Sequence, residues 1–148
     1  MEYCSPVWNP QYVGNVKKIE AVQRSFTKRL KGLSNLTYSK RLFVLQAESL
    51  ELRRLKSDLV LLFNIITGRS AIGNNLLSLD ANIYCTRGHN FKLAKTHCSI
   101  NCRLHSFAVR CMNIRNSLPA RIVNSCSLSV FKRQLQMYDL NKFCVVLE

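Results

Sequence analysis

Acidic residues are scarce in this chain. Its 148 residues include 22 Lys and Arg but only 8 Asp and Glu, which gives a formal net charge of +14. No acidic residue occurs between Glu20 and Glu48, nor between Asp80 and Asp139. Nucleotidyl transfer on two metal ions needs clustered carboxylates to hold the ions, and these scattered acids supply no such cluster. The sequence therefore excludes that chemistry, and we expect no enzyme activity from this chain.

Glycine and long apolar runs are also few. The five glycines are isolated, so no Gly-rich phosphate loop is present, and we expect neither a cofactor nor a small-molecule substrate. The longest apolar run, residues 59–66, is interrupted by Asn64 and is far shorter than the roughly 20 residues that cross a bilayer. No secretory signal is visible at the start. Seven irregularly spaced cysteines then predict reduced thiols and an intracellular location, in the nucleus or cytoplasm.

The excess of positive charge predicts a polyanionic partner. Such a field attracts nucleic acid, and it self-repels when no partner neutralises it. An anionic membrane surface is disfavoured, because no stretch pairs a basic face with an aromatic apolar face. An ordinary solvated basic surface is the remaining alternative.

Residues 49–68 carry the clearest helical signal. Ser49 is a natural N-cap, and Gly68 can adopt the left-handed conformation that ends a helix. The opposite edge of this helix is mostly basic. Apolar residues at spacings of three and four predict one buried face, made of Leu52, Leu55, Leu59, Leu62, Phe63 and Ile66.

Four further helical segments follow from the same reasoning. Residues 15–31 form the most basic one, ended by Gly32, with Ile19, Val22, Phe26 and Leu30 expected inward. Thr37 caps residues 38–45. Asn101 caps residues 102–116, which Leu118-Pro119 ends, with Leu104, Phe107, Ala108, Cys111 and Ile114 expected inward. Ser127 caps the last helix, to about residue 138, with Leu128, Phe131, Leu135 and Tyr138 inward.

These segments predict a mainly α domain, a helical bundle with a small irregular or hairpin-containing segment. Residues 1–14 are an extended entry segment, and residues 15–68 are the basic helical bundle core. Residues 69–101 are a loop and hairpin region, in which Ile83–Lys95 alternates loosely. Residues 102–148 carry the C-terminal helices.

Nine residues on the basic helices are candidate nucleic-acid contacts. Tyr38 is the candidate for stacking on bases, whereas Phe26 is expected in the core and Tyr12 is a further aromatic among basic residues. If these cations share one continuous face, nucleic-acid binding is favoured. If they are scattered, solvation of an ordinary surface is enough to explain them. The full set is Arg24, Lys28, Arg29, Lys31, Tyr38, Lys40, Arg41, Arg53 and Arg54.

One group of thiols and imidazoles has the residue types that tetrahedral zinc prefers. Its spacing fits no standard zinc finger, and buried thiols with surface histidines explain the same residues. The candidates are Cys85, His97, Cys98, Cys102 and His105, with His89 nearby. We expect no metal site.

Several runs resemble the region after the polymerase core in reverse transcriptases of jockey-like, LINE-type (non-LTR) retrotransposons. The resemblance is ordered and extends from about Glu2 to Tyr138. It is carried by EYCSPVWNP, VQRSFTKRLKGLSNLTYSKRL, SLELRRLKSDLVLLFNIITG, TRGHNFKL and NSLPARIVNSCSLSVFKRQL. The resemblance implies a thumb and C-terminal extension that help to grip template and primer, next to an upstream palm domain.

The chain departs from that family at two places. Arg115 stands where a Trp usually precedes Asn-Ser-Leu-Pro, and Ser39 and Lys40 replace an acidic pair that would complete a capping box with Thr37. The resemblance and the charge together imply a non-catalytic remnant that binds the backbone of RNA or DNA. The alternatives are an orphaned fragment that docks on a polymerase core, with Trp8 as its anchor, or a zinc-binding regulator.

Overall fold

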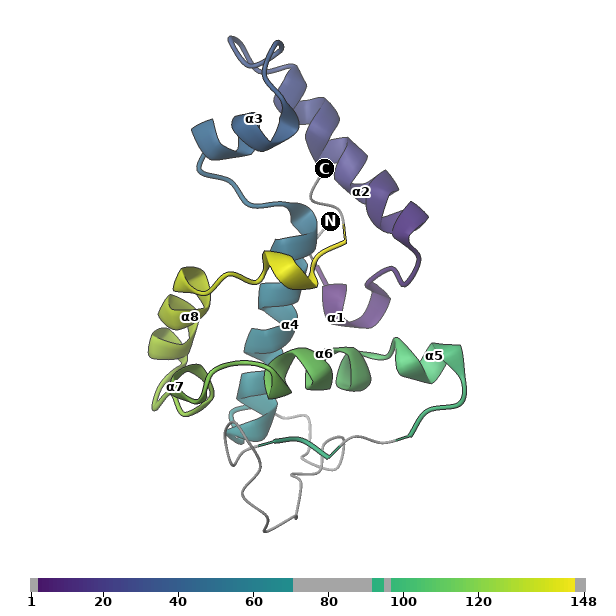
Figure 1. Ribbon diagram of the computed structural model, residues 1–148, viewed down its shortest axis with the longest axis vertical. Helices are drawn as coiled ribbons and strands as arrows, with labels where there is room; N and C mark the ends of the chain where they lie inside the picture. The colour runs from purple at the N-terminus through teal and green to yellow at the C-terminus, as the bar shows by residue number, and fades with distance from the viewer. Residues whose placement is uncertain (1–2, 71–91, 95–96, 146–148) are drawn as a thin grey trace. The chain divides into compact units, whose positions relative to one another are not determined.

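The computed structural model describes residues 3–70, 92–94 and 97–145. These residues are mainly helical, which confirms the expected fold class (Figure 1). The chain forms two compact units, which we call unit 1, Met1–Leu55 with Leu140–Glu148, and unit 2, Lys56–Asp139. This division differs from the four stretches expected from sequence. Its first boundary falls inside a helix, whereas the expected boundaries fall at the ends of helical segments.

Unit 1 begins with a four-residue helix, α1 (Ser5–Trp8), where an extended segment was expected. Pro6 does not prevent this helix, because it lies in the first turn, where a missing N–H costs nothing. Helices α2 (Val13–Lys28) and α3 (Tyr38–Val44) follow, joined by a loop, and α4 (Leu50–Ile66) starts in this unit. A short 3-10 helix, Asn141–Phe143, belongs to it as well.

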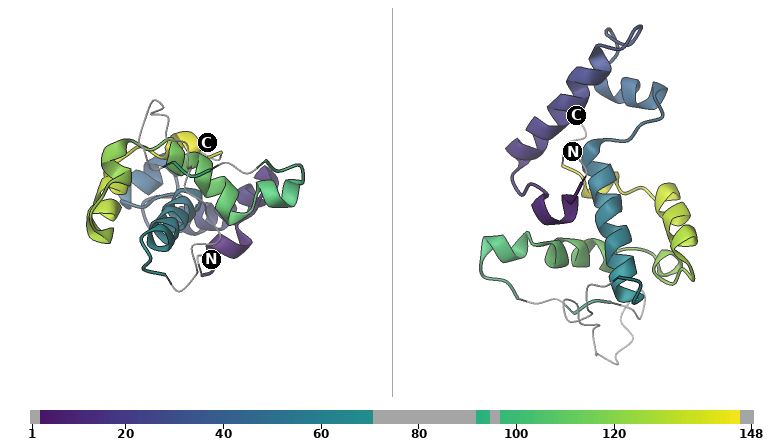
Figure 2. Two further views of the ribbon diagram at one scale, coloured as in Figure 1. Left: turned by 90° about the horizontal axis from the view of Figure 1, so that it is seen from below. Right: turned by 180° about the vertical axis from the view of Figure 1, so that it is seen from behind.

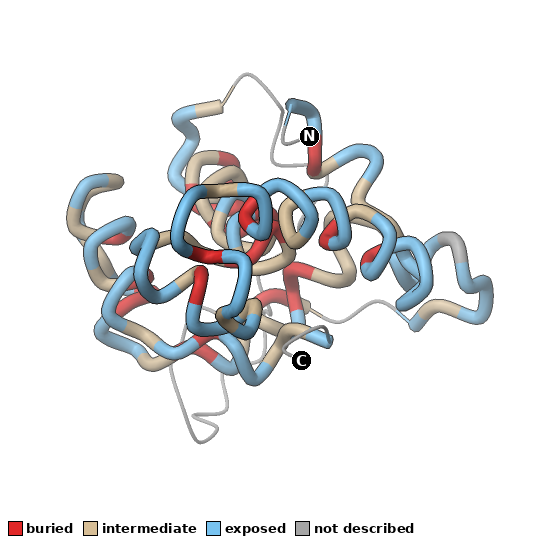
Figure 3. The backbone as a smooth tube through the Cα atoms, turned by 90° about the horizontal axis from the view of Figure 1, so that it is seen from above, coloured by how far each residue is buried: buried red, intermediate tan, exposed pale blue. Residues whose placement is uncertain are grey.

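The expected apolar face of α2 is wrong. Val22 and Phe26 are exposed, and the helix instead buries Val16, Glu20 and Thr27. Figure 3 shows this burial pattern along the backbone. The periodicity identified the helix correctly but not the side that packs, because the buried side is mostly polar.

Unit 2 contains the rest of α4 and four shorter helices: α5 (Asn101–Leu104), α6 (Phe107–Asn116), α7 (Ala120–Val123) and α8 (Leu128–Met137). In two views α6 runs across the part of α4 that belongs to this unit (Figures 1 and 2). Leu62 of α4 packs there with Leu93, Cys111 and Met112. Phe63 stacks on Phe131 of α8, with ring centroids 4.4 Å apart. Unit 2 therefore has an ordinary apolar core.

Helix ends agree with most of the expected caps. The Ser49 hydroxyl accepts a hydrogen bond from the Leu52 N–H, and the Ser127 hydroxyl accepts one from the Val130 N–H. Gly68 has the expected left-handed conformation, with φ 68°. Thr37 precedes α3 as predicted, but its side chain makes no cap hydrogen bond.

The expected helix over residues 102–116 is two helices, interrupted at His105 and Ser106. Leu104 consequently lies exposed rather than inward, while Cys111 is fully buried as expected. Asn101 is the first residue of α5 and not its cap. The short helix α7 after Pro119 was not expected, and most of the predicted hairpin, Ile83–Lys95, lies outside the described residues.

Candidate nucleic-acid interface

Four of the predicted contact residues lie at the connection between α2 and α3. Lys28 ends α2, Arg29 and Lys31 lie in the loop that follows, and Lys40 lies in the first turn of α3. All four side chains are exposed, and none has an ion-pair partner among the described residues. We call these four residues the basic cluster. It places positive charge at one end of the α2–α3 pair, where a phosphate backbone could approach (Figure 1).

Buried Glu20 of α2 links this helix to α3 and to the start of α4. Its carboxylate accepts hydrogen bonds from the Tyr38 hydroxyl and from the backbone N–H of Leu50, the latter at 3.1 Å. Leu50 is the first residue of α4, so the carboxylate satisfies a helix N–H that has no partner within the helix. A negative charge at that helix end is also favoured by the helix dipole.

Arg41 is buried and serves as a second link between α3 and α2. Its guanidinium donates to the Thr27 hydroxyl at 3.2 Å, and to the carbonyl oxygens of Leu36 and Arg24. The same Arg24 carbonyl accepts a hydrogen bond from Thr27. Arg41 is therefore committed to structure and is not available to a phosphate.

Two guanidinium groups lie over the Tyr38 ring. The Arg24 and Arg41 carbons lie 4.9 Å and 5.6 Å from its ring centroid, within the range of cation–π attraction. Burial, with the hydrogen bond to Glu20, raises the pKa of the Tyr38 phenol well above its usual range. Because two guanidinium groups lie over its ring and its hydroxyl is hydrogen-bonded to buried Glu20, Tyr38 is poorly placed to stack on a base.

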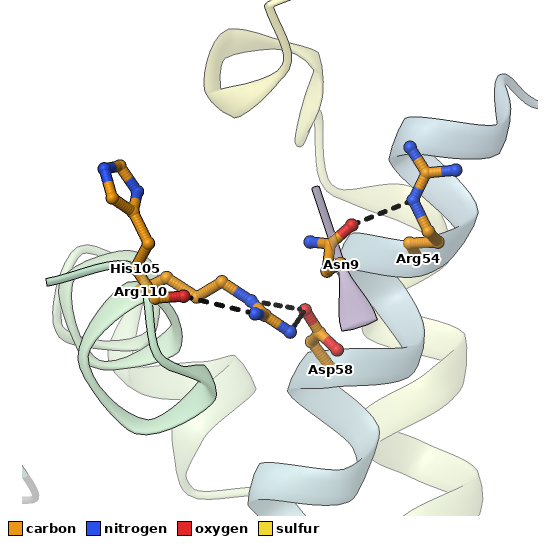
Figure 4. A network of polar contacts seen from close by, with 5 residues as sticks. All are labelled: Asn9, Arg54, Asp58, His105 and Arg110. Atoms are coloured by element: carbon orange, nitrogen blue, oxygen red, sulfur yellow. Dashed lines mark hydrogen bonds and ion pairs between the residues drawn. The ribbon is translucent and has the colours of Figure 1, made fainter. Parts of the chain in front are cut away.

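The remaining predicted contacts divide between surface and interior. Arg53 is exposed on α4, and Arg24 is half-buried. Arg54 is almost fully buried, and its Nε donates to the Asn9 side chain at 3.0 Å (Figure 4). The basic cluster and Arg53 are thus the predicted contacts that the structure leaves open to solvent.

The chain resembles no characterised protein closely enough to assign a family. A scan against family models gives no match, and searches of curated proteins and of solved structures give no significant match.

Sequence reasoning missed the exposed aromatic side chains of unit 1. Phe26 on α2 is 63 % exposed, and Phe43 on α3 is 86 % exposed. Apolar spacing alone placed Phe26 in the core. Glu20 is the residue that could have indicated the packed side of α2. Its buried carboxylate has the Tyr38 hydroxyl and the Leu50 N–H as partners.

Some charged side chains of unit 2 interact with one another or are buried inside the unit. Arg110 of α6 forms an ion pair with buried Asp58 of α4 at 2.9 Å and donates to the His105 carbonyl at 3.4 Å (Figure 4). Burial raises the pKa of the Cys111 thiol far above its usual range, with Asp58 acting in the same direction. Burial also lowers the pKa of Arg115 to about 10.

The zinc candidates do not come together in the described residues. His97 and His105 are exposed and Cys98 is half-buried, whereas Cys85 and the Cys102 side chain lie outside the description. No group of three or more possible ligands is found in the described part of the chain. Cys4, Cys98, Cys111, Cys126 and Cys144 are free thiols. Among the described residues, no helix combines the length and apolar character needed to cross a membrane.

Proposed function

We propose that this chain is a non-catalytic module that binds RNA or DNA through the phosphate backbone. The observation that carries the proposal is the basic cluster, four exposed cations at one end of the α2–α3 pair with no ion-pair partner among the described residues. Glu20, the nearest acidic residue along α2, is buried and hydrogen-bonded, so it does not neutralise the cluster at the surface.

The resemblance to the thumb and C-terminal extension of LINE-type reverse transcriptases supports this proposal. Such a region grips template and primer, a task that needs backbone contacts and little base reading. We therefore propose that the chain is a remnant of such an enzyme and acts in the nucleus or cytoplasm. Its partner is the nucleic-acid backbone, with little preference for sequence.

The test is binding of the full chain to labelled single-stranded RNA and to duplex DNA across a salt series. Four phosphate contacts predict a slope of roughly −3.6 in log affinity against log salt for duplex DNA. This corresponds to about 100-fold weaker binding between 50 and 200 mM salt.

A charge-matched pair of variants locates the site. The first changes Lys28, Arg29, Lys31 and Lys40 to Ser. The second changes four exposed cations of unit 2 to Ser, namely Arg103, Arg121, Lys132 and Arg133. Both lose four positive charges, so the proposal expects a large loss of affinity and of salt slope only in the first. Equal losses, or affinity that is flat with salt, contradict it.

A second candidate function is docking on a polymerase palm. Its support is an apolar surface at the start of unit 1, where Tyr3 and Val7 are almost fully exposed and Trp8 is 40 % exposed. The Trp8 indole N–H donates to the Tyr3 carbonyl, so the ring is held against this segment. Co-elution with the purified palm of a LINE-type reverse transcriptase, lost in Val7→Asp, would support it; separate elution would contradict it.

A further inference from the structure

One side of α2 carries an exposed stripe in which two cations flank two apolar side chains. Lys18, Val22 and Phe26 of α2 and the C-cap residue Arg29 follow one another at spacings of four, four and three, so they lie on the same side of the helix and its end. Val22 is 49 % exposed and Phe26 is 63 % exposed. We call these four residues the α2 stripe, and at the helical rise it is about 16 Å long.

The side-chain hydrogen bonds of Glu20, Thr27 and Gln23 come from outside the α2 stripe. They link α2 to α3 and to the segment before α4, with Tyr38, Arg41 and the Glu48 carbonyl as partners. The Phe26 side chain remains mostly exposed, and about half of Val22 is exposed one turn away. An exposed aromatic side chain next to exposed positive charges is typical of a surface that contacts a partner.

The chemistry of the α2 stripe selects the kind of ligand. Lys18 and Arg29 attract phosphates at its two ends, and the Phe26 ring offers a face on which a base can stack. A duplex keeps its bases paired and stacked inside, so only a single strand can bring a base to this ring. A second copy of the chain would bring the same positive charges and be repelled.

We infer that the α2 stripe is a stacking platform for single-stranded nucleic acid, with Phe26 as the residue that contacts the base. This inference rests on the proposed function and makes it more specific. The basic cluster binds the backbone of single strands and duplexes alike, and Phe26 adds affinity for single strands only. Phe26 takes this role in place of Tyr38, the expected stacking residue, because two guanidinium groups lie over the Tyr38 ring.

The experiment compares an unstructured 12-nucleotide oligouridylate with a 12-base-pair duplex at one salt concentration, using the full chain. Phe26→Ala is expected to bind the single strand about tenfold more weakly and the duplex unchanged. Phe26→Trp keeps an aromatic face and should bind the single strand at least as tightly as the native chain. Tyr12→Ala is the matched control, because Tyr12 is 69 % exposed but lies outside the α2 stripe.

The outcomes separate this inference from the proposed function. If the basic-cluster variant loses affinity while Phe26→Ala does not, or loses it equally on both ligands, the stacking inference fails and the proposed function stands. If the native chain binds neither ligand, both fail. If Phe26→Ala converts a self-associated chain to a monomer in light scattering, the α2 stripe is a contact between copies and the inference is overturned. Circular dichroism checks that each variant folds.

Discussion

In unit 2 the side chains removed from water are mostly aliphatic and aromatic, as in the stack of Phe63 on Phe131. In unit 1, α2 buries Glu20 and Thr27 while Val22 and Phe26 remain in water. Apolar packing is insensitive to direction, whereas buried polar groups are stable only when every partner is in place. Helix α2 of unit 1 thus buries polar side chains and leaves apolar ones exposed, whereas the buried side chains of unit 2 are mostly apolar.

The largest effect is expected from Leu62→Ala in unit 2. Leu62 is fully buried, so truncation should cost about 3 kcal/mol of unfolding free energy through lost burial and a cavity. Chemical denaturation measures this loss, and hydrogen exchange should show faster opening in α6. Leu104→Ala is the matched control, because Leu104 is partly exposed in the same unit and should change stability little. Similar losses for both would contradict the described core.

Glu20→Ala tests whether polar contacts hold unit 1. The change leaves the Leu50 N–H and the Tyr38 hydroxyl without their acceptor, which should cost about 2 kcal/mol. Hydrogen exchange should accelerate in α2 and α3. Lys18→Ala, exposed on the same helix, should leave exchange unaltered. A Glu20→Ala protein as stable as the native chain would mean that unit 1 is held by other contacts.

Arg115→Met removes a buried charge from the apolar unit. Burial lowers the pKa of Arg115 to about 10, which shows that the charged form is disfavoured there. Replacement by Met removes this charge together with the contacts of the guanidinium, and removing one partner of a buried charged contact should lower the Tm. Arg121→Met, at an exposed position of the same unit, should give no such loss. A higher Tm for Arg115→Met would show that burial of the charge outweighs the contacts of its guanidinium.

A decline of stability is also expected in mild alkali. Burial raises the pKa of Cys111 in the folded state, so between about pH 8.5 and 10 the unfolded chain ionises this thiol while the folded one keeps its proton. Unfolding then releases a proton, and stability falls with rising pH by up to about 1.4 kcal/mol per pH unit. Thermal melts from pH 7 to 10 measure the slope.

Substitution of this cysteine provides the control for the pH series. Cys111→Ala should remove the part of the slope that comes from this thiol, although its Tm is lower throughout because of the lost packing. Cys126→Ala, at an exposed position, should keep the native slope. An unchanged slope in Cys111→Ala would contradict the assignment to this thiol.

Local signals predicted much of the fold. Helices α4 and α8 were expected because their N-caps, Ser49 and Ser127, and their apolar periodicity all act within a few residues. The four-residue helices α1 and α7 are too short to show a period. The interruption before α6 was also missed, because residues 102–116 have no Gly or Pro to mark it.

The candidate site was predicted less completely, because its arrangement depends on contacts distant in sequence. Charge and the absence of acids identified the exposed cations at the end of α2. Arg41 and Arg54 looked equivalent to them, yet Thr27 and Asn9, 14 and 45 residues away, draw both side chains inside unit 1. The packed side of α2 was missed for the same reason, since Glu20 has its partners on α3 and α4.

The Asn-Ser-Leu-Pro run, which is part of the resemblance, also has a structural role within unit 2. The Asn116 side chain donates to the Leu93 carbonyl and accepts from the Leu93 N–H, each at 2.9 Å. Leu118 is buried, and Pro119 is the N-cap residue of α7. Asp in place of Asn116 could not donate, and Leu could do neither. Folding of unit 2 alone therefore accounts for these residues, independently of any binding by unit 1.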